Sequence, residues 1–210
     1  MIISDDKKYI FIAVPKTGTS SITDLLLNSD RSAKRNTVSI GEKIIQTNEH
    51  ITAKNLRNIL GDNWKEYYTF GFVRNPLDRL VSFYFFYKEG RVAQRIIEGE
   101  SVKFRARFHH IMAKYITMFL WRYLYFGKDC SYYLCDENNI IVDKVYSFKN
   151  IRTELKGLFN RIGLDESVVD DMKKMNPTEH KHYLEYYGNI SRKIIGFKYR
   201  RDYKNFSIYF

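Results

Sequence analysis

The chain has 210 residues, and its 35 Lys and Arg against 24 Asp and Glu give a formal net charge of +11. Apolar residues make up 44%, which supports a sizeable core at this length and excludes an intrinsically disordered chain. We therefore expect one folded domain over residues 1–210. The positive charge favours an acidic partner, such as nucleic acid, an anionic membrane, a polyanion or a phosphorylated small molecule.

Three features of the chain bear on its compartment. Charged residues occur within residues 1–8, before any long apolar stretch, so the sequence predicts no signal peptide. The spacing of Cys130 and Cys135 fits neither a zinc pair nor a disulfide framework, which favours free thiols in a reducing compartment. The most apolar window, residues 111–126, contains basic residues and is a poor membrane span. Together these features predict a cytoplasmic protein without a transmembrane segment.

Strands and helices alternate in the predicted order of elements. Residues 9–14 are apolar, aromatic and β-branched, which is typical of a buried parallel strand. A polar loop follows, and then a helix is predicted over residues 21–27. A second buried strand is predicted over residues 68–73, and two short strands around a turn over residues 140–148.

Capping residues place two helices on either side of the second strand. Thr52 is a suitable N-cap, and Gly61 a suitable stop, for a helix over residues 53–60. Asn75 can cap a helix over residues 76–88, which has Pro at its first position.

The remaining segments complete the expected fold. Asn150 is a possible cap for a helix that ends at Gly163, and residues 91–127 have a helical character. Residues 28–49 are polar and weakly patterned, which predicts surface structure, and the tail from Pro177 predicts one or two helices. The alternation indicates an α/β fold: a single P-loop-like domain with a central, mainly parallel sheet flanked by helices.

The loop over residues 15–21 (PKTGTSS) carries the sharpest local signal. A turn from a strand into a helix presents backbone N–H groups and the positive end of the helix dipole. Gly18 lets the backbone approach an anion closely, Lys16 adds a positive charge, and the hydroxyls of residues 19–21 add donors. The loop suits a phosphate or sulfate group, although an ordinary polar turn also fits these residues. It is not a Walker A loop, because Lys16 precedes Gly18.

A second signal follows the strand over residues 68–73. Arg74 lies where the strand ends, at the carboxyl edge of the sheet, where open α/β folds place their ligands. Ser82 comes seven residues after Asn75, about two helical turns, so it shares the face of the cap. Arg74 and Ser82 can therefore grip one anionic group from two sides. The alternative is an ion-pair partner at Arg74 and an ordinary helix position at Ser82.

Taken together, the two signals resemble the sulfotransferases. Residues 15–21 resemble their 5′-phosphosulfate loop, and residues 72–82 resemble their 3′-phosphate motif. The similarity is closest to the "family 2" carbohydrate sulfotransferases of the bacterial and Golgi type. Weaker similarities lie in residues 49–50, 61–64, 142–145, 148–150 and the aromatic C-terminus, and Lys149 departs from the family's usual Glu.

The resemblance implies an activity and a set of site residues. The expected reaction is in-line transfer of a sulfuryl group from 3′-phosphoadenosine 5′-phosphosulfate (PAPS) to a hydroxyl group of a carbohydrate or glycolipid. It implies a nucleotide donor, no metal and no nucleic acid. Lys16 would also neutralise charge on the leaving group. The expected donor-binding residues are Lys16, Thr17, Gly18, Thr19, Ser20 and Ser21 at the 5′-phosphosulfate, and Arg74 and Ser82 at the 3′-phosphate.

The acceptor hydroxyl needs a general base, and His50 is the first candidate. An imidazole titrates in a suitable range, and related carbohydrate sulfotransferases have a histidine in this region. Glu49 is the second candidate, and a plain surface or capping role also fits His50. The further histidines are weaker candidates: His109, His110, His180 and His182.

Two other functions fit part of the sequence. A P-loop nucleotide kinase or other NTPase is disfavoured by the order of Lys16 and Gly18 and by the lack of a clear Walker B aspartate. A non-catalytic module that binds polyanions or nucleic acid would explain the net charge and the aromatic residues. It would not explain two anion-binding signals at the ends of strands.

Overall fold

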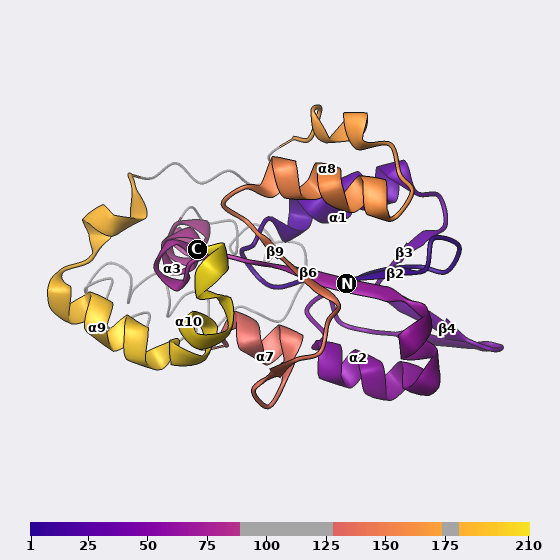
Figure 1. Ribbon diagram of the computed structural model, residues 1–210, viewed down its shortest axis with the longest axis horizontal. Helices are drawn as coiled ribbons and strands as arrows, with labels where there is room; N and C mark the ends of the chain where they lie inside the picture. Colours follow the sequence, from indigo (N-terminus) through magenta and orange to yellow (C-terminus); the bar gives the residue numbers. More distant parts are fainter. Residues whose placement is uncertain (89–127, 174–180) are drawn as a thin grey trace. The chain divides into compact units, whose positions relative to one another are not determined.

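The computed structural model describes residues 1–88, 128–173 and 181–210, and Figure 1 shows these parts. The helical character expected for residues 91–127 falls outside the described residues. So do the apolar window and three of the histidines named above: residues 111–126, His109, His110 and His180.

The chain divides into two compact units. The first consists of Met1–Arg74, Asp129–Asn176 and Arg201–Phe210, and the second of Asn75–Lys128 and Pro177–Arg200. The expectation of one domain over residues 1–210 stays a prediction.

A five-stranded sheet forms the centre of the first unit, with the strand order β3-β1-β2-β6-β9. Strands β2, β6 and β9 pair in parallel, whereas β1 pairs antiparallel with both β2 and β3. The predicted α/β fold is confirmed, and its parallel part is the trio β2-β6-β9. The strands are β1 (Ile2–Ser4), β2 (Tyr9–Ile12), β3 (Ala33–Arg35), β6 (Tyr68–Val73) and β9 (Lys144–Ser147).

Two small antiparallel pairs accompany this sheet. Strand β4 (Thr37–Ile40) pairs with β5 (Lys43–Gln46), and β7 (Cys135–Asp136) pairs with β8 (Asn139–Ile140). Residues 28–49 therefore hold three strands, which their weak patterning did not reveal. Strands β8 and β9 do lie near the predicted pair over residues 140–148, but each pairs with a different partner.

Helices of the first unit cover both faces of the sheet. Figure 1 shows α1 and α8 on one side of β2, β6 and β9, and α2 and α7 on the other. The predicted helix over residues 53–60 is confirmed, since the Thr52 hydroxyl accepts from the Asn55 N–H at 3.1 Å and Gly61 ends it. The elements are α1 (Thr19–Ser29), α2 (Ala53–Leu60), α7 (Cys130–Leu134), α8 (Ile151–Arg161), α10 (Arg200–Phe206) and the 3-10 turns η1 (Gly61–Glu66), η2 (Glu166–Val169) and η4 (Ser207–Tyr209).

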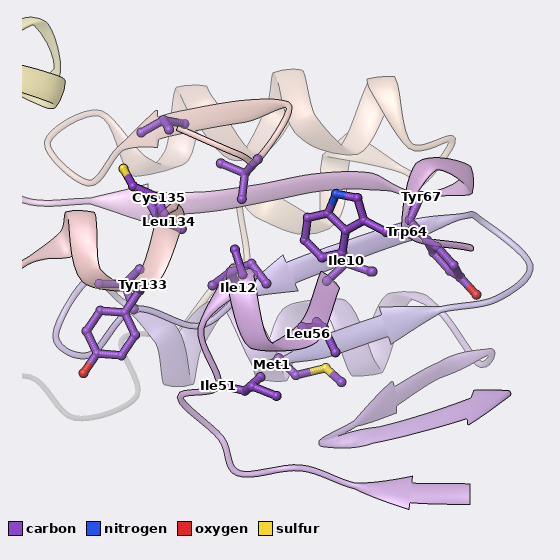
Figure 2. Packing of buried hydrophobic residues seen from close by; sticks show 14 of the residues in the cluster. Met1, Ile10, Ile12, Ile51, Leu56, Trp64, Tyr67, Tyr133, Leu134 and Cys135 are labelled. Atoms are coloured by element: carbon purple, nitrogen blue, oxygen red, sulfur yellow. The ribbon is translucent and has the colours of Figure 1, made fainter. Parts of the chain in front are cut away.

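Alternation along the buried strands builds two separate apolar clusters. In β2, Ile10 and Ile12 point to the face covered by α2 and α7, whereas Tyr9 and Phe11 point to the face covered by α1 and α8. All four side chains are fully buried. Figure 2 shows Ile10 and Ile12 among the residues of the first cluster, which include Leu56 of α2. A strand apolar on both faces therefore lies inside the sheet, as the sequence predicts.

Gly71 permits the close approach of α7 to the sheet. A Cβ at this position in β6 would lie 2.5 Å from Cδ2 of Leu134, and contacts between real atoms do not come that close. The glycine in the middle of a buried strand therefore makes room for a neighbouring helix.

Helix α3 (Pro76–Lys88) begins the second unit, which also holds η3 (Tyr183–Tyr186) and α9 (Asn189–Lys198). The predicted cap is confirmed, since the Asn75 side-chain oxygen accepts from the Leu77 N–H at 3.0 Å. The Tyr187 hydroxyl donates to the Leu77 carbonyl at 2.8 Å and joins the C-terminal segment to α3. None of the helices in the described residues is long and apolar enough to span a membrane.

A buried carboxylate ties the C-terminal helix to α7, and its removal should destabilise the fold. Asp202 is 0% exposed and accepts from the N–H groups of Cys130 and Ser131 and from the Ser131 hydroxyl, each at 2.8 Å. We expect Asp202→Ala to lower the free energy of unfolding by about 2–3 kcal/mol, because three donors lose a charged acceptor. Urea unfolding followed by circular dichroism measures this change.

The matched control is Asp62→Ala. The Asp62 side chain is exposed and its pairing with Lys65 is 3.9 Å long, so its removal should leave the unfolding curve unchanged. Equal curves for the two variants would contradict the role given to Asp202.

Candidate functional site

The parallel pairing brings three connections to the same edge of the sheet. Ile12 pairs with Gly71, and Val73 pairs with Ser147, so β2, β6 and β9 end near one another. The Phe148 N–H donates to the Val73 carbonyl at 2.9 Å and extends the last pairing by one residue. The segments that follow these strands therefore lie at the carboxyl edge, where the sequence predicts a ligand site.

Unusual backbone angles shape the loop between β2 and α1. Lys16 has φ of +65°, a left-handed conformation that is uncommon for a residue with a side chain, and Gly18 has φ of +80°. Gly18 occupies the N-cap position of α1, and its carbonyl accepts from the Ile22 N–H at 3.0 Å. A Cβ at Gly18 would lie 2.9 Å from Ile151 Cδ1 and 3.0 Å from Phe148 Cε2, so only glycine fits.

Two threonine hydroxyls hold this loop in shape. Thr17 and Thr19 are both buried, and both donate to the Val14 carbonyl, at 2.8 Å and 2.7 Å. A hydroxyl has one proton to donate, so in this arrangement neither side chain offers a donor to a bound anion. The sequence pattern suggested the Thr19 hydroxyl as a donor to an anion. In this arrangement Thr19 can contribute its backbone amide but not its hydroxyl. Ser20 is exposed and Ser21 is half-buried.

Arg74 lies against the same loop. Its Nη1 donates to the Lys16 carbonyl at 3.2 Å, and its guanidinium carbon is 4.4 Å from the centroid of the Phe148 ring. The side chain is half-buried. The structure thus brings Arg74 and Lys16 together, as the two sequence signals predict, and it places two cationic residues beside the N-terminus of a helix.

His50 also reaches this edge of the sheet. Its Nδ1 lies 2.8 Å from the carbonyl oxygen of Ala13, the residue directly after β2. Because a carbonyl only accepts, Nδ1 carries the proton, and the lone pair of the neutral ring is on Nε2. The ring of Tyr133 packs edge-on at a centroid distance of 6.5 Å. The tautomer that a general base needs is therefore set by the backbone next to the loop.

Glu49, the second candidate base, has a different partner. Its carboxylate pairs with Arg35 at 3.1 Å. A carboxylate oxygen that already accepts from a guanidinium is less available to accept the proton of an acceptor hydroxyl. The geometry favours His50 over Glu49.

The remaining predicted residues belong to the second unit. Ser82 lies in α3 and is 5% exposed, and its share in binding the 3′-phosphate stays a prediction. His182 is exposed, with the ring of Tyr183 at a centroid distance of 4.5 Å. The family resemblance also implies that residues 175–181 close near the nucleotide, and all of them except Lys181 lie outside the described residues.

The described residues offer no grouping of His, Cys, Asp and Glu that could hold a metal ion. Cys130 and Cys135 form no disulfide, as predicted, and both are buried. Burial raises the pKa of the Cys135 thiol to about 11, so it is a poor nucleophile at neutral pH. The reactive groups of the described site are therefore cationic side chains, backbone amides and an imidazole.

Sequence reasoning missed two contributors to the site. The Ala13 carbonyl orients His50, and the ring of Phe148 lies against both Gly18 and Arg74. A backbone carbonyl has no sequence signal. An aromatic residue directly after a strand that ends at the ligand edge is a signal, although such residues more often serve the core.

A comparison with known proteins identifies the family of the chain. A model of the sulfotransferase family matches residues 1–209. Searches among curated proteins and among solved structures gave no significant match. The family match covers the loop between β2 and α1, Arg74 and His50 together with almost all of the remaining chain, which confirms the resemblance seen in the two motifs. The chain belongs to the sulfotransferase family.

Proposed function

We propose that the protein transfers a sulfuryl group from PAPS to a hydroxyl group of a carbohydrate or glycoconjugate. The observation that carries this proposal is the meeting of the loop, Arg74 and His50 at one edge of the sheet. Arg74 is hydrogen-bonded to the Lys16 carbonyl, and His50 is hydrogen-bonded to the Ala13 carbonyl. The proposed anion-binding cations and the proposed base are therefore linked through the same stretch of backbone.

The residues at this edge suit the two ends of such a donor. The first amides of α1 and the Lys16 side chain are placed for the 5′-phosphosulfate, because a helix N-terminus and a mobile ammonium both favour a negative group. Arg74 is placed for the 3′-phosphate, since a planar guanidinium binds phosphate through two parallel hydrogen bonds. The share of Ser82 in binding the 3′-phosphate rests on the sequence resemblance alone.

The proposed reaction needs one proton acceptor and one neutralised leaving group. The acceptor oxygen forms a bond to sulfur, the bond from sulfur to the bridging oxygen breaks, and the bisphosphate leaves. His50 Nε2 takes the hydroxyl proton, and Lys16 balances the charge that develops on the bridging oxygen. As in phosphoryl transfer, most of the rate enhancement would come from positioning and charge.

Two elements of the proposal rest on the sequence alone. The carbohydrate or glycolipid acceptor follows from the "family 2" resemblance, and the cytoplasmic location remains a prediction. A panel of bacterial glycans and lipo-oligosaccharides, offered with labelled PAPS, tests the first. Labelled product from none of them, in a protein that binds the donor, would remove the carbohydrate part of the proposal.

Ligand stabilisation separates the proposed function from its two alternatives. We expect 3′-phosphoadenosine 5′-phosphate to raise the melting temperature more than ATP, heparin or duplex DNA does at matched ionic strength, because ligand binding to the folded state stabilises it. Differential scanning fluorimetry gives this ranking. Stabilisation by ATP without stabilisation by the bisphosphate would favour an NTPase, and stabilisation by heparin or DNA alone would favour a polyanion-binding module.

Lys16 and Arg74 should affect different kinetic parameters. Arg74→Ala should raise KM for PAPS at least tenfold, about 1.4 kcal/mol, because a bound phosphate loses a charge-assisted pair. Lys16→Ala should lower kcat more than it weakens donor binding, since its contact strengthens as charge develops in the transition state. Steady-state kinetics with PAPS as the varied substrate measures both. Equal losses in kcat and in donor affinity for Lys16→Ala would assign it to binding only.

His50 should be needed for transfer and not for donor binding. We expect His50→Ala to reduce kcat at least a hundredfold, the usual scale of general base catalysis, with an unchanged affinity for the bisphosphate. His182→Ala, which removes an exposed histidine of the second unit, is the control and should keep full turnover. Turnover of His50→Ala close to that of the control would rule out His50 as the base.

A further inference from the structure

We infer that Phe148 is a positioning residue that fixes Arg74 and the loop over residues 15–21, the proposed phosphosulfate loop, relative to each other. This inference rests on the proposed function and assigns a residue to that same site. The ring lies directly against Gly18, where Cε2 would come within 3.0 Å of an added Cβ, and the Arg74 guanidinium lies over it at 4.4 Å. One side chain thus touches both elements predicted to bind the donor.

Phe148 differs from the other phenylalanines of the central sheet and α8. Phe11, Phe70, Phe72 and Phe159 are fully buried in the apolar cluster on the α1 and α8 face. Phe148 is only half-buried and belongs to neither of the two apolar clusters of the described residues. Its ring packs on a glycine backbone and on a cation, so its place in the fold is not explained by core formation.

The backbone of Phe148 fixes where its ring stands. Its N–H donates to the carbonyl of Val73, the residue before Arg74, at 2.9 Å, and its carbonyl accepts from the Ile151 N–H at 3.3 Å. The ring therefore starts from the end of β9, beside the end of β6, and extends to the loop after β2. Any shift of β9 against β6 would move the loop contact and the Arg74 contact together.

Stacking orients Arg74 without consuming its donors. A guanidinium that lies over an aromatic ring keeps its N–H groups in its own plane, where they can meet a phosphate. Nη1 donates within this plane to the Lys16 carbonyl at 3.2 Å. The Phe148 ring and the Lys16 carbonyl together restrict the rotamers of the Arg74 side chain. This pre-organisation lowers the entropic cost of binding a phosphate.

The test compares nucleotides with and without a 3′-phosphate. We expect Phe148→Leu, which keeps the apolar volume and removes the ring, to weaken binding of 3′-phosphoadenosine 5′-phosphate about three- to tenfold. Binding of adenosine 5′-phosphate should weaken less, so the preference for the 3′-phosphate should fall. Phe148→Tyr keeps the ring and should restore the preference of the wild type. Isothermal titration calorimetry gives the two affinities.

A double-mutant cycle with Arg74→Ala separates positioning from general stability. If the ring acts through Arg74, Phe148→Leu should lose most of its effect on bisphosphate affinity in the Arg74→Ala background. The control is Phe159→Leu, which removes a buried ring from α8 and should lower the melting temperature while the nucleotide preference stays unchanged. Should Phe148→Leu fail to fold, Phe148→Met takes its place, since methionine fills similar volume with a flexible chain.

The outcomes distinguish this inference from the proposed function. Additive effects in the cycle, or an unchanged nucleotide preference in Phe148→Leu, would overturn the role of Phe148 even if the wild type binds the bisphosphate tightly. A wild type that does not bind the bisphosphate would instead overturn the proposed function.

Discussion

The register of the three parallel strands is the constraint on which the site of the first unit depends. Because β2, β6 and β9 run in the same direction and pair side by side, their three following connections meet at one edge of the sheet. The backbone bond from Phe148 to Val73 continues this pairing to the first residue of the site. A slip of one residue between β6 and β9 would turn buried side chains to the wrong face. The two apolar clusters therefore fix the site's geometry as well as the fold.

The loop between β2 and α1 is held in an unfavourable conformation by its surroundings. Lys16 adopts a left-handed backbone, and Gly18 is required by both its angle and the contacts of Phe148 and Ile151. Two buried hydroxyls, from Thr17 and Thr19, converge on one carbonyl oxygen and offset this cost. The polar residues of the motif thus fall into two groups, one that shapes the loop and one that is proposed to bind an anion.

The sequence reveals the elements that depend on local chemistry and misses those that depend on distant partners. The strand over residues 68–73 and the helix over residues 53–60 have the predicted bounds, because their apolar runs and caps are local signals. The sequence does not reveal strands β1, β3, β4 and β5. They are short, and they form by pairing with other strands rather than from a local signal in their composition. Arg74 and Lys16 could be predicted to converge, because the carboxyl ends of parallel strands always share an edge.

The tautomer of His50 is a feature of the candidate site that the sequence does not predict. Its residue type and its approximate place were readable from the sequence, but its tautomer depends on a carbonyl of Ala13, 37 residues earlier in the chain. That carbonyl lies between the end of β2 and the loop, so the hydrogen bond that orients the imidazole is anchored to the same backbone that carries Lys16. His50 and Lys16 are thus tied to one stretch of backbone, which constrains the distance between the proposed base and the proposed cation. The proposed in-line transfer would need such a constraint, because the base acts on the acceptor side and the cation on the leaving-group side.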